Sequence, residues 1–530
     1  MKTFYIIVFI FFSTILIGQS LSEEKLSVRK DFSGILADVE PLNSLFSFDQ
    51  FNDNTQAVVV GDSLLNDVDQ TIHIDLNIEP LSFETPFLND GSNGHMMVSR
   101  GLLNTLGVQG KLLKKVDNYF DVGIEGNYSN WVDRSVSDKF TNEIKALIST
   151  RYFVTDRSLF DLKIGGSKDQ YGVFSNLRPN DYSSDTINIK RFNVGTSYQS
   201  FNDDPRAVNY SLSINYNNTI SQDATKENQW RLQPMINKKL NDLIMVQLTS
   251  DNTFSSNQRM NNTFASSNDL MFQLNQNTFT LSIGGKLNIY DQNKTIYPSF
   301  RSNIYLSNHS ILSATVSENL SYIGLTQLLA SNPYLDHEYI QSSVKRSRDH
   351  RLALVSKIDK SFEVTGQLSY SNVIGDINWT QSPDAPQYFV NVSANYTLWQ
   401  SLIKVNYTHS SWLRGSLQLT KNIYNAESDI TLFYRPDHQI DLGVNMITNN
   451  QKFSFSINAD VADRQSMAVI NEQVISSDYK YDLSFGVNYR PYDFVSLRIT
   501  GSNMLNNSLE IFRGYEVFSR NVSLHALFKF

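Results

Sequence analysis

The side chains that could carry chemistry in this sequence are eight scattered histidines and one dense basic cluster. No two histidines have the spacing of a metal site, and they are His73, His95, His309, His337, His350, His409, His438 and His525. His525 shares one face of a short alternating segment with Ser523, which is typical of a polar wall. Neither a serine-nucleophile elbow nor a glycine-rich phosphate loop occurs. We therefore predict no enzyme, no catalytic residue, no metal and no cofactor.

The basic cluster comprises Lys345, Arg346, Arg348 and Arg351, with His350 among them. Guanidinium and ammonium groups at this density could bind phosphate oxygens. The alternative is a solvated strand end that faces water. The formal net charge of -8 over 530 residues excludes a basic surface of the kind that binds nucleic acid.

The C-terminal segment indicates which elements must position these side chains. In residues 521–530 a mostly polar face alternates with an apolar face made of Val522, Leu524, Ala526, Phe528 and Phe530. Successive side chains of a strand point to opposite faces. A strand of a membrane β-barrel has this pattern, with lipid outside and a wet lumen inside. A final strand ending in Phe528 and Phe530 also resembles the signal that the bacterial outer-membrane assembly machinery recognises.

The same alternation recurs through residues 94–530, and its clearest segments are 388–396, 453–461, 481–489 and 495–501. Several apolar faces begin or end in Tyr or Phe, as aromatic girdles at a bilayer interface do. We predict an all-β fold, a single large antiparallel transmembrane β-barrel. At about 20 residues per strand with its loop, it has about 22 strands, within a range of roughly 18–24.

The connections give an independent test, because such barrels have short periplasmic turns and long outer loops. With a periplasmic C-terminus, residues 323–349, 463–479 and 506–520 become outer loops. Residues 307–309, 360–361, 399–400, 449–450 and 491–493 become inner turns, while short turns near Ser410 and Asp437 fall on the outer side. The basic cluster then lies at the far end of an outer loop, where lipopolysaccharide phosphates are its candidate ligand.

The first 93 residues differ from the rest. Lys2, the apolar residues 5–17 and the small residues at 18 and 20 predict a signal peptide for Sec export, residues 1–20, with a cut after Gly18 as the alternative. Residues 21–93 form a predicted periplasmic extension with one alternating strand at 72–78. This extension could pack in the barrel mouth, pair with another protein, or be a partly ordered lead-in. The chain has no cysteine, which excludes disulfides and a lipidated N-terminal Cys.

Two motifs resemble the barrel half of TonB-dependent outer-membrane receptors, especially the short receptor-like proteins of Bacteroidota. One is Asn332-Pro333-Tyr-Leu335 with Glu338. The other precedes the terminal strand and comprises Asn503, Asn506, Gly514, Tyr515 and Arg520. The resemblance implies the outer membrane of a Gram-negative bacterium. The plug domain of that family is longer than residues 21–93, which also lack its Gly-rich motif, so we predict a barrel without a plug.

The sequence supports two functional hypotheses. The chain is predicted to be a pore or a solute-binding transport channel, without plug-based energised uptake. The alternative is a structural or scaffold subunit of an outer-membrane complex that docks a periplasmic partner. Expected partners are outer-membrane lipid and lipopolysaccharide, the assembly machinery during biogenesis, and a periplasmic or outer-membrane protein.

Overall fold

The computed structural model describes residues 94–530 apart from short gaps in the connections. The gaps are residues 117–118, 134–135, 137, 156, 176–184, 201–206, 223–224, 242, 259–261, 291–292, 337, 360, 410–411, 428–430, 449–451, 464, 471–472, 478 and 508–509. The predicted signal peptide and the predicted extension at 21–93 lie outside the described residues and stay predictions.

Strands make up nearly all of the described chain. The barrel strands are β1 (Gly94–Gly101), β2 (Leu106–Lys115), β3 (Phe120–Val132), β4 (Phe140–Thr155), β5 (Ser158–Gly172), β6 (Thr186–Ser200), β7 (Val208–Ile220), β8 (Lys226–Lys239), β9 (Ile244–Asn257), β10 (Thr263–Gln276), β11 (Phe279–Tyr290), β12 (Asn293–Ser307), β13 (Ser310–Ile323), β14 (Ser343–Lys357), β15 (Phe362–Gln381), β16 (Phe389–His409), β17 (Leu413–Ala426), β18 (His438–Ile447), β19 (Phe453–Ala462), β22 (Lys480–Tyr492), β23 (Val495–Ser502) and β26 (Asn521–Lys529). The connections carry the helix α2 (Leu325–Ser331) and the short strands β20 (Ser466–Ile470), β21 (Gln473–Ser476), β24 (Glu510–Phe512) and β25 (Tyr515–Glu516).

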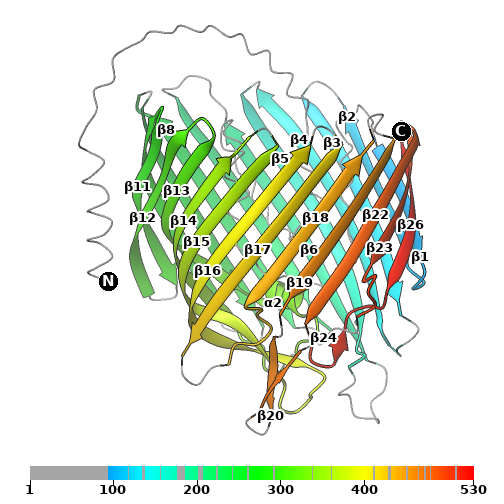
Figure 1. Ribbon diagram of the computed structural model, residues 1–530. Coiled ribbons are helices and arrows are strands. Elements are labelled where there is room, and N and C mark those ends of the chain that lie inside the picture. The colour runs from blue at the N-terminus through cyan, green and yellow to red at the C-terminus, as the bar shows by residue number, and fades with distance from the viewer. Residues whose placement is uncertain are drawn as a thin grey trace. The chain divides into compact units, whose positions relative to one another are not determined.

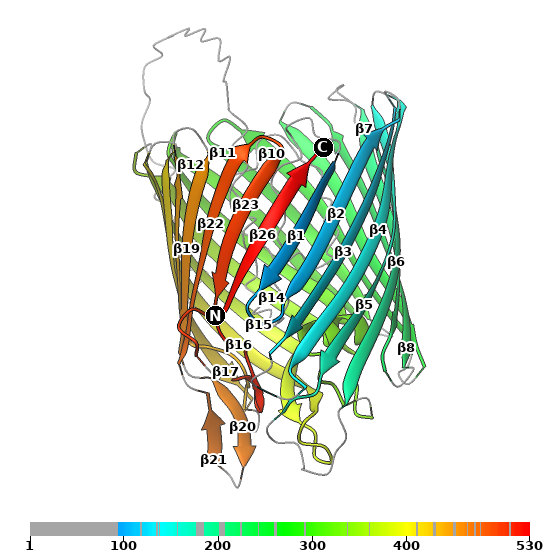
Figure 2. The same ribbon diagram turned by 90° about the vertical axis from the view of Figure 1, so that its right-hand side faces the viewer.

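The barrel strands form one closed 22-stranded antiparallel sheet (Figure 1, Figure 2). Each strand pairs with the next along the chain, and β26 pairs back with β1. At this seam the backbones of Gly94 and Phe530 exchange hydrogen bonds of 2.9 and 3.0 Å. Closure satisfies the backbone groups that an open sheet edge would leave unpaired, apart from the outer part of the β12–β13 ladder, which ends at Phe300 and Val316. The predicted fold and the predicted strand number are confirmed.

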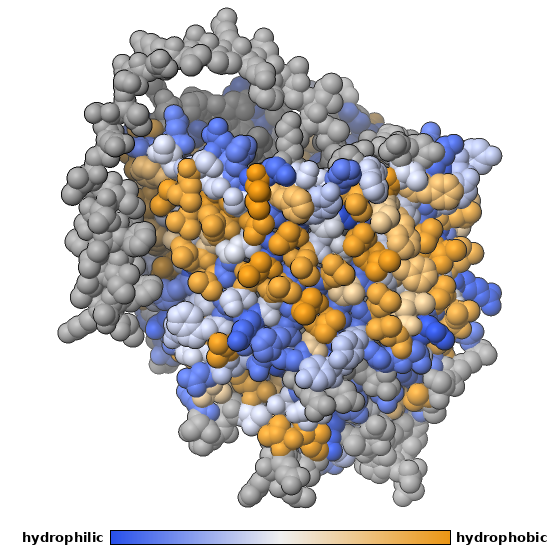
Figure 3. Space-filling view, in the orientation of Figure 1, coloured by the Kyte–Doolittle hydropathy of each residue, from blue (hydrophilic) through white to orange (hydrophobic). Residues whose placement is uncertain are grey.

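The outward face of the barrel is an apolar belt. Large side chains on it are about half exposed, for example Leu368 at 59% and Trp399 at 56%. On the face that Figure 3 shows, apolar side chains gather in a band across the middle, with more polar side chains above and below it. The residues of opposite parity face the lumen and are mostly Ser, Thr, Asn and Gln. This division between an apolar outside and a polar inside is the one that a bilayer imposes on a barrel.

Aromatic pairs border the belt at two levels, as the sequence predicts. Pairs close to the end with short turns are Phe120–Tyr152, Phe362–Tyr407, Phe453–Tyr489 and Tyr492–Phe494. Pairs farther along the strands are Tyr216–Trp230, Phe254–Phe264 and Tyr370–Trp399. Rings with an apolar body and a polar tip accumulate at the two membrane interfaces, so these pairs delimit the spanning segment.

Long and short connections lie at opposite ends of the barrel. The end that holds the C-terminus, uppermost in Figure 1, has short turns such as residues 308–309, 358–361 and 493–494. The other end, which we call the outer end, has the long connections 173–185, 324–342, 427–437, 463–479 and 503–520. In the part of the chain that the structure describes, no helix has the length and hydropathy needed to cross a membrane.

Strand β16 corrects two predicted turns. Residues 399–400 are not a turn, because β16 runs unbroken for 21 residues. Because no turn interrupts β16, the turn after His409 lies at the inner end of the barrel and not at the predicted outer end. Asp437 lies at the end of a long connection on the outer side, between β17 and β18. A membrane-spanning strand needs about 9–11 residues, so β15 and β16 extend well beyond the bilayer. The predicted apolar face of 388–396 is divided, because Ala394 and Tyr396 are buried whereas Val392 is 46% exposed.

Candidate functional site at the outer mouth

The outer connections pack together into one apolar core, which we call the cap core. Its members come from positions far apart in the closed sheet, including β6, β15 and the connection between β23 and β26. The cap core therefore spans the outer mouth. It consists of Val173, Phe174, Ile187, Ile189, Ile323, Leu325, Leu328, Leu329, Tyr334, Leu335, Trp379, Phe389, Tyr434, Met467, Phe512 and Tyr515.

Helix α2 is held inside the barrel by Glu227, which is fully buried at the outer end of β8. Its Oε2 accepts hydrogen bonds from the backbone N–H and the hydroxyl of Thr326, both at 3.0 Å. Its Oε1 accepts hydrogen bonds from Ser255 at 2.9 Å and from Tyr322 at 3.0 Å. The Thr326 hydroxyl also lies 2.7 Å from that of Thr219 on β7. The connection between β13 and β14 is thus anchored to the lumen side of β7, β8 and β9.

Gly324 permits the close approach of α2 to this carboxylate. A Cβ at that position would lie 2.0 Å from Oε1 of Glu227 and 2.5 Å from the ring of Tyr322. No side chain fits there without displacing the contact. Gly324 also donates its N–H to Gln327 at 3.2 Å, which closes the first turn of α2.

A pair of stacked tyrosines lies at the centre of the cap core and joins the two family-like motifs. The rings of Tyr334 and Tyr515 have centroids 3.7 Å apart and planes at 24°. The Tyr515 hydroxyl donates to the carbonyl of Gln387 at 2.6 Å. Burial raises the pKa of the Tyr334 phenol, so this hydroxyl stays neutral. The resemblance thus pointed to segments that pack against each other across the mouth.

The remaining residues of the first motif shape the backbone around Tyr334. Asn332 is buried, and its Oδ1 accepts the N–H of Tyr334 at 2.9 Å. Pro333 is also buried, and Leu335 belongs to the cap core and bridges to Phe389. Glu338 is exposed and donates its N–H to Asp336 at 3.1 Å.

The second motif closes the connection between β23 and β26. Asn503 and Asn506 have positive φ angles of 46° and 53°, which Asn tolerates better than most residues. The Asn506 side chain accepts the N–H of Arg520 at 2.9 Å. Gly514 has φ 84°, a conformation that favours glycine, and places Tyr515 in the cap core. These roles are structural.

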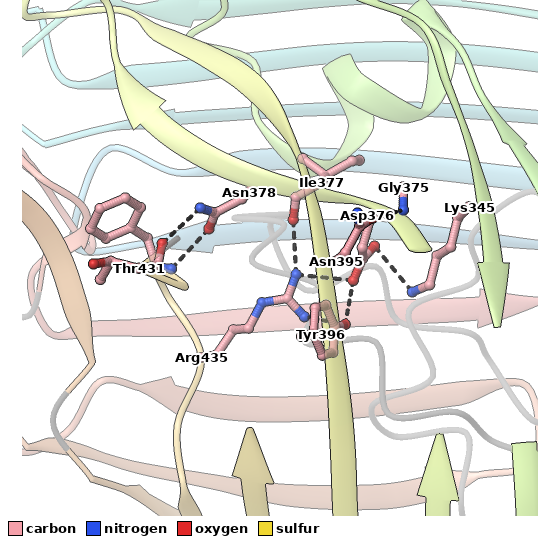
Figure 4. Close-up of polar contacts among 10 residues, drawn as sticks. Lys345, Gly375, Asp376, Ile377, Asn378, Asn395, Tyr396, Thr431 and Arg435 are labelled. Atoms are coloured by element: carbon pink, nitrogen blue, oxygen red, sulfur yellow. Dashed lines mark hydrogen bonds and ion pairs between the residues drawn. The ribbon is translucent and has the colours of Figure 1, made fainter. Parts of the chain in front are cut away.

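A buried polar network fixes the outer ends of β14, β15 and β16 to the connection at 427–437 (Figure 4). Asp376 lies 3.1 Å from Lys345 and 2.9 Å from Arg435, and it accepts the Tyr396 hydroxyl at 2.5 Å. Arg435 also donates to the carbonyl of Ile377 at 2.8 Å and stacks over the Tyr396 ring at 4.6 Å. Every strong hydrogen-bonding group of this network has a partner, so it acts as a latch on the cap.

Further contacts attach the same connection to its neighbours. The Asn378 side chain donates to the carbonyl of Thr431 and accepts the N–H of Phe433, both at 2.8 Å, as Figure 4 shows. Burial raises the pKa of Tyr434, which keeps its phenol neutral within the cap core. Burial and the nearby charge of Asp463 also raise the pKa of Asp437 at the end of the connection.

On the other side of the mouth, Lys139 joins the connection between β3 and β4 to residues 517–519. Its ammonium lies 5.4 Å from the ring centroid of Phe174 and 5.5 Å from that of Phe518. It pairs with Asp133 at 3.4 Å and donates to the carbonyl of Val517 at 2.6 Å. Cation–π contacts of a desolvated ammonium are stronger than those at a surface.

The predicted basic cluster does not lie in an outer loop. β14 begins at Ser343, so Lys345, Arg346, Arg348 and Arg351 are all strand residues. Lys345 forms an ion pair with Asp376, and Nε of Arg348 lies 2.5 Å from the fully buried Glu318. The sequence pattern missed these acids because they are remote in sequence. Binding of lipopolysaccharide by this cluster stays a prediction, and its Lys345 and Arg348 already have acidic partners.

The lumen wall offers hydrogen-bonding groups rather than a metal site. Within the described ranges, no three His, Asp or Glu side chains gather in a geometry that could hold a metal ion. His525 lies on the wall and its Nε2 is 2.9 Å from the Thr500 hydroxyl, as expected for a polar wall residue. Asp441, Asp460 and Asp482 are direct cross-strand neighbours on β18, β19 and β22, which places like charges side by side.

At the C-terminus, Phe528 and Phe530 face outward and are 45% and 64% exposed. This exposure suits residues on the lipid side of the final strand. Their predicted role as an assembly signal is not tested by the fold.

Solved structures with the same barrel include iron and siderophore receptors. The FrpB iron transporter from Neisseria meningitidis (F3-3 variant) aligns with TM-score 0.66 and 10% identity, covering 83% of this chain and 82% of FrpB. The siderophore receptor PirA from Acinetobacter baumannii aligns with TM-score 0.65 and 11% identity, covering 82% and 80%. A mutant of the ferric enterobactin receptor PfeA from Pseudomonas aeruginosa gives 0.63 and 10%, covering 83% and 81%.

The fold is that of the TonB-dependent receptor barrels. No protein-family model and no curated protein matches the sequence. At identities near 10% the likeness concerns architecture, and the residues of the cap must be interpreted from their own contacts. The predicted absence of a plug falls on residues 21–93, outside the described part of the chain, and stays a prediction.

Three residues that hold the cap were not singled out by the sequence, namely Glu227, Asp376 and Arg435. Each is a charged residue near the outer end of a strand or in an outer connection. Their partners are distant in sequence, since Thr326 lies 99 residues from Glu227 and Arg435 lies 59 residues from Asp376. A charge at a strand end is ordinary by itself, and only the fold shows that Glu227 and Asp376 are buried and that Arg435 pairs with Asp376.

Proposed function

We propose that this protein is an outer-membrane transport barrel whose polar lumen is gated at the outer mouth by its own connections. The observation that carries the proposal is the cap core, which spans the mouth of a barrel too wide to be filled by its wall side chains. A permanently open pore has no use for a cap with a buried aromatic centre and a latch. A gated path needs both.

The composition of the lumen supports passage of a polar solute. Neutral side chains such as Gln229, Thr253 and Gln367 line the wall. Such groups replace the hydration of a solute without binding it too tightly to leave. The solved neighbours are described as an iron transporter and siderophore receptors, which supports a transport role in the outer membrane. The proposal does not include energised uptake, because that activity depends on a plug.

Single-channel recording of the purified full-length protein in planar bilayers tests the proposal. We expect long closed periods for the wild type and more frequent openings when the latch is broken by Arg435→Met. The Met side chain keeps the length of the Arg stem and removes the guanidinium that binds Asp376. A matched control is Arg414→Met, an arginine at the inner end of β17 and so at the opposite end of the barrel from the latch.

The scaffold hypothesis makes the opposite prediction for the same experiment. A scaffold subunit needs a covered lumen at all times and gains nothing from a gate. If a latch-broken variant that retains a folded barrel stays silent, the lumen is not a path, and the scaffold hypothesis takes its place. Proteins that co-purify with the barrel would then identify the complex.

A further inference from the structure

The backbone hydrogen-bond ladder between β12 and β13 stops about half-way toward the outer end of the barrel. The two strands pair from Ser307 and Ser310 at the inner end up to Phe300 and Val316. Beyond that point residues 293–299 of β12 pair only with β11, and residues 317–323 of β13 pair only with β14. β13 instead reaches inward and contacts β10 and β11. A free backbone edge of this length is unusual inside an otherwise closed sheet.

The two free edges match each other in length and register. If the ladder continued from Phe300 and Val316, Ile296 would oppose Leu320, and Asn293 would oppose Ile323, the terminal residues of the two strands. The side chains of residues 295, 297 and 299 and of residues 317, 319 and 321 would then face the lumen, and all of these are polar. Ile296, now 81% exposed, would gain an apolar neighbour in Leu320.

Pro298 lies in the middle of the free edge of β12. The N–H of Tyr305 bonds to Thr278 on the β11 side, so the even-numbered residues of β12 direct their N–H positions toward β13. The missing N–H of Pro298 therefore falls on the open edge, where it removes no bond in the present structure. Proline within sheets is tolerated at such edges, at strand starts and at bulges. If the ladder between β12 and β13 extended to the outer end, Pro298 would leave it one hydrogen bond short. Neither the fully paired nor the partly paired ladder would therefore be strongly favoured over the other.

Side chains, rather than backbone bonds, bridge the open part of the wall. Glu318 accepts Asn288 of β11 at 2.7 Å and Thr295 of β12 at 3.1 Å. Arg348 lies over the ring of Tyr297 at 5.3 Å, and the Tyr297 hydroxyl lies 3.2 Å from Nε2 of His350. These contacts hold the β13–β14 hairpin in its inward position.

We propose that the outer part of the β13–β14 hairpin is the moving part of the gate. In the present state the hairpin leans inward and carries α2 and Tyr334 into the cap core. In the open state residues 317–323 pair with residues 293–299, the wall closes, and the same motion withdraws α2 from the lumen. One element with two alternative sets of partners has the bistability that a gate requires. This inference rests on the proposed transport function and specifies how the same site opens.

Engineered disulfides test the motion directly, because the chain has no cysteine. Ile296→Cys with Leu320→Cys joins opposed positions of the ladder that is open here. Ser302→Cys with Ala314→Cys joins positions that are already paired and serves as the control. Thr219→Cys with Thr326→Cys replaces two hydroxyls that lie 2.7 Å apart and locks α2 in the lumen. A disulfide needs Cα atoms within about 7 Å, so each bond reports a defined arrangement.

The cross-links are scored by mass spectrometry in membranes and by conductance of the full-length protein in bilayers. We expect oxidation to link 296 to 320 and to raise the open time about tenfold or more, and we expect the 219–326 bond to abolish openings until a reductant is added. The 302–314 bond should form and leave the open time unchanged. If the control links but 296 and 320 do not, or if their bond forms without a change in conductance, the hairpin motion is refuted.

The two proposals fail in different ways. If the 219–326 bond silences a channel that the reductant restores, the lumen is a gated path whether or not 296 and 320 can be linked. In that case the transport function stands and only the hairpin motion is wrong. If no variant conducts in either redox state, the transport function itself is refuted.

Discussion

Glu227 offers the sharpest test of the cap, because one carboxylate binds α2, β9 and β13 together. We expect Glu227→Ala to release α2 from the wall while the barrel stays folded. The change leaves the Thr326 N–H without an acceptor and removes one partner of the Tyr322 hydroxyl, which retains Ser255 at 2.9 Å. The barrel itself depends on backbone ladders that this side chain does not touch.

The size of the effect follows from the groups that lose their partner. Hydrogen bonds to a charged group contribute about 1.5–3 kcal/mol each, and an unsatisfied buried donor costs about 1–3 kcal/mol. Removing the buried charge itself offsets part of this loss. Taking a net destabilisation of about 3 kcal/mol for the closed cap, the ratio of open to closed molecules rises on the order of a hundredfold.

The measurement is the open probability of single channels in planar bilayers, with the shift in gel mobility on heating as the check that the barrel is folded. Gly324→Ala should act in the same direction, since its Cβ would fall 2.0 Å from Oε1 of Glu227. Thr365→Ala, on the lumen side of β15, is the matched control. If both cap variants keep the wild-type open probability, Glu227 does not hold the cap closed.

Three further predictions concern the latch, the cap core and the lumen wall. Arg435→Met leaves the buried Asp376 with one cation fewer. We expect protease added to intact cells to cleave the outer connections faster in this variant than in the wild type. An unchanged cleavage rate would show that the network does not hold these connections in place. Tyr515→Ala removes the ring that stacks on its partner across the mouth and should destabilise the cap by about 3–5 kcal/mol, seen as a higher open probability than that of Tyr515→Phe. Asp460→Asn relieves repulsion with both cross-strand neighbours and should stabilise the barrel by about 0.2–1 kcal/mol per neighbour, measured as a higher unfolding temperature, whereas an unchanged or lower unfolding temperature would show that the three carboxylates do not repel one another.

The barrel was predictable from sequence because its signal is local and repeated. Lipid lies on one side of every strand, so each strand carries the alternation by itself. The recurrence predicts a barrel, the chain length per strand gives about 22 strands within a range of roughly 18–24, and most connections are assigned to the correct side. The cap was not predictable in this way. Its contacts join residues such as Glu227 and Thr326, which no local pattern links. The family-like motifs came closest, since they contain both Tyr515 and the segment around Tyr334, but they gave no indication that these rings stack.

The position of the cap nevertheless leaves a trace in the alternation, as a change of phase within a single strand. In β6, Ile187 and Ile189 are buried on the lumen side, whereas Phe192 faces outward at 45% exposure. In β16 the buried Tyr396 and the exposed Trp399 likewise belong to opposite phases.

The physical cause is that the apolar surroundings of a strand change sides along its length. Within the bilayer the apolar medium is lipid, on the outward face. Above the bilayer the outward face meets water, and the only apolar surroundings are those of the cap, on the lumen face. A change of phase without turn residues therefore marks the point at which a strand leaves the membrane and begins to support a cap. A strand of an uncapped pore has no apolar medium on its lumen face at any height, so it should end in polar residues on both faces and show no such change.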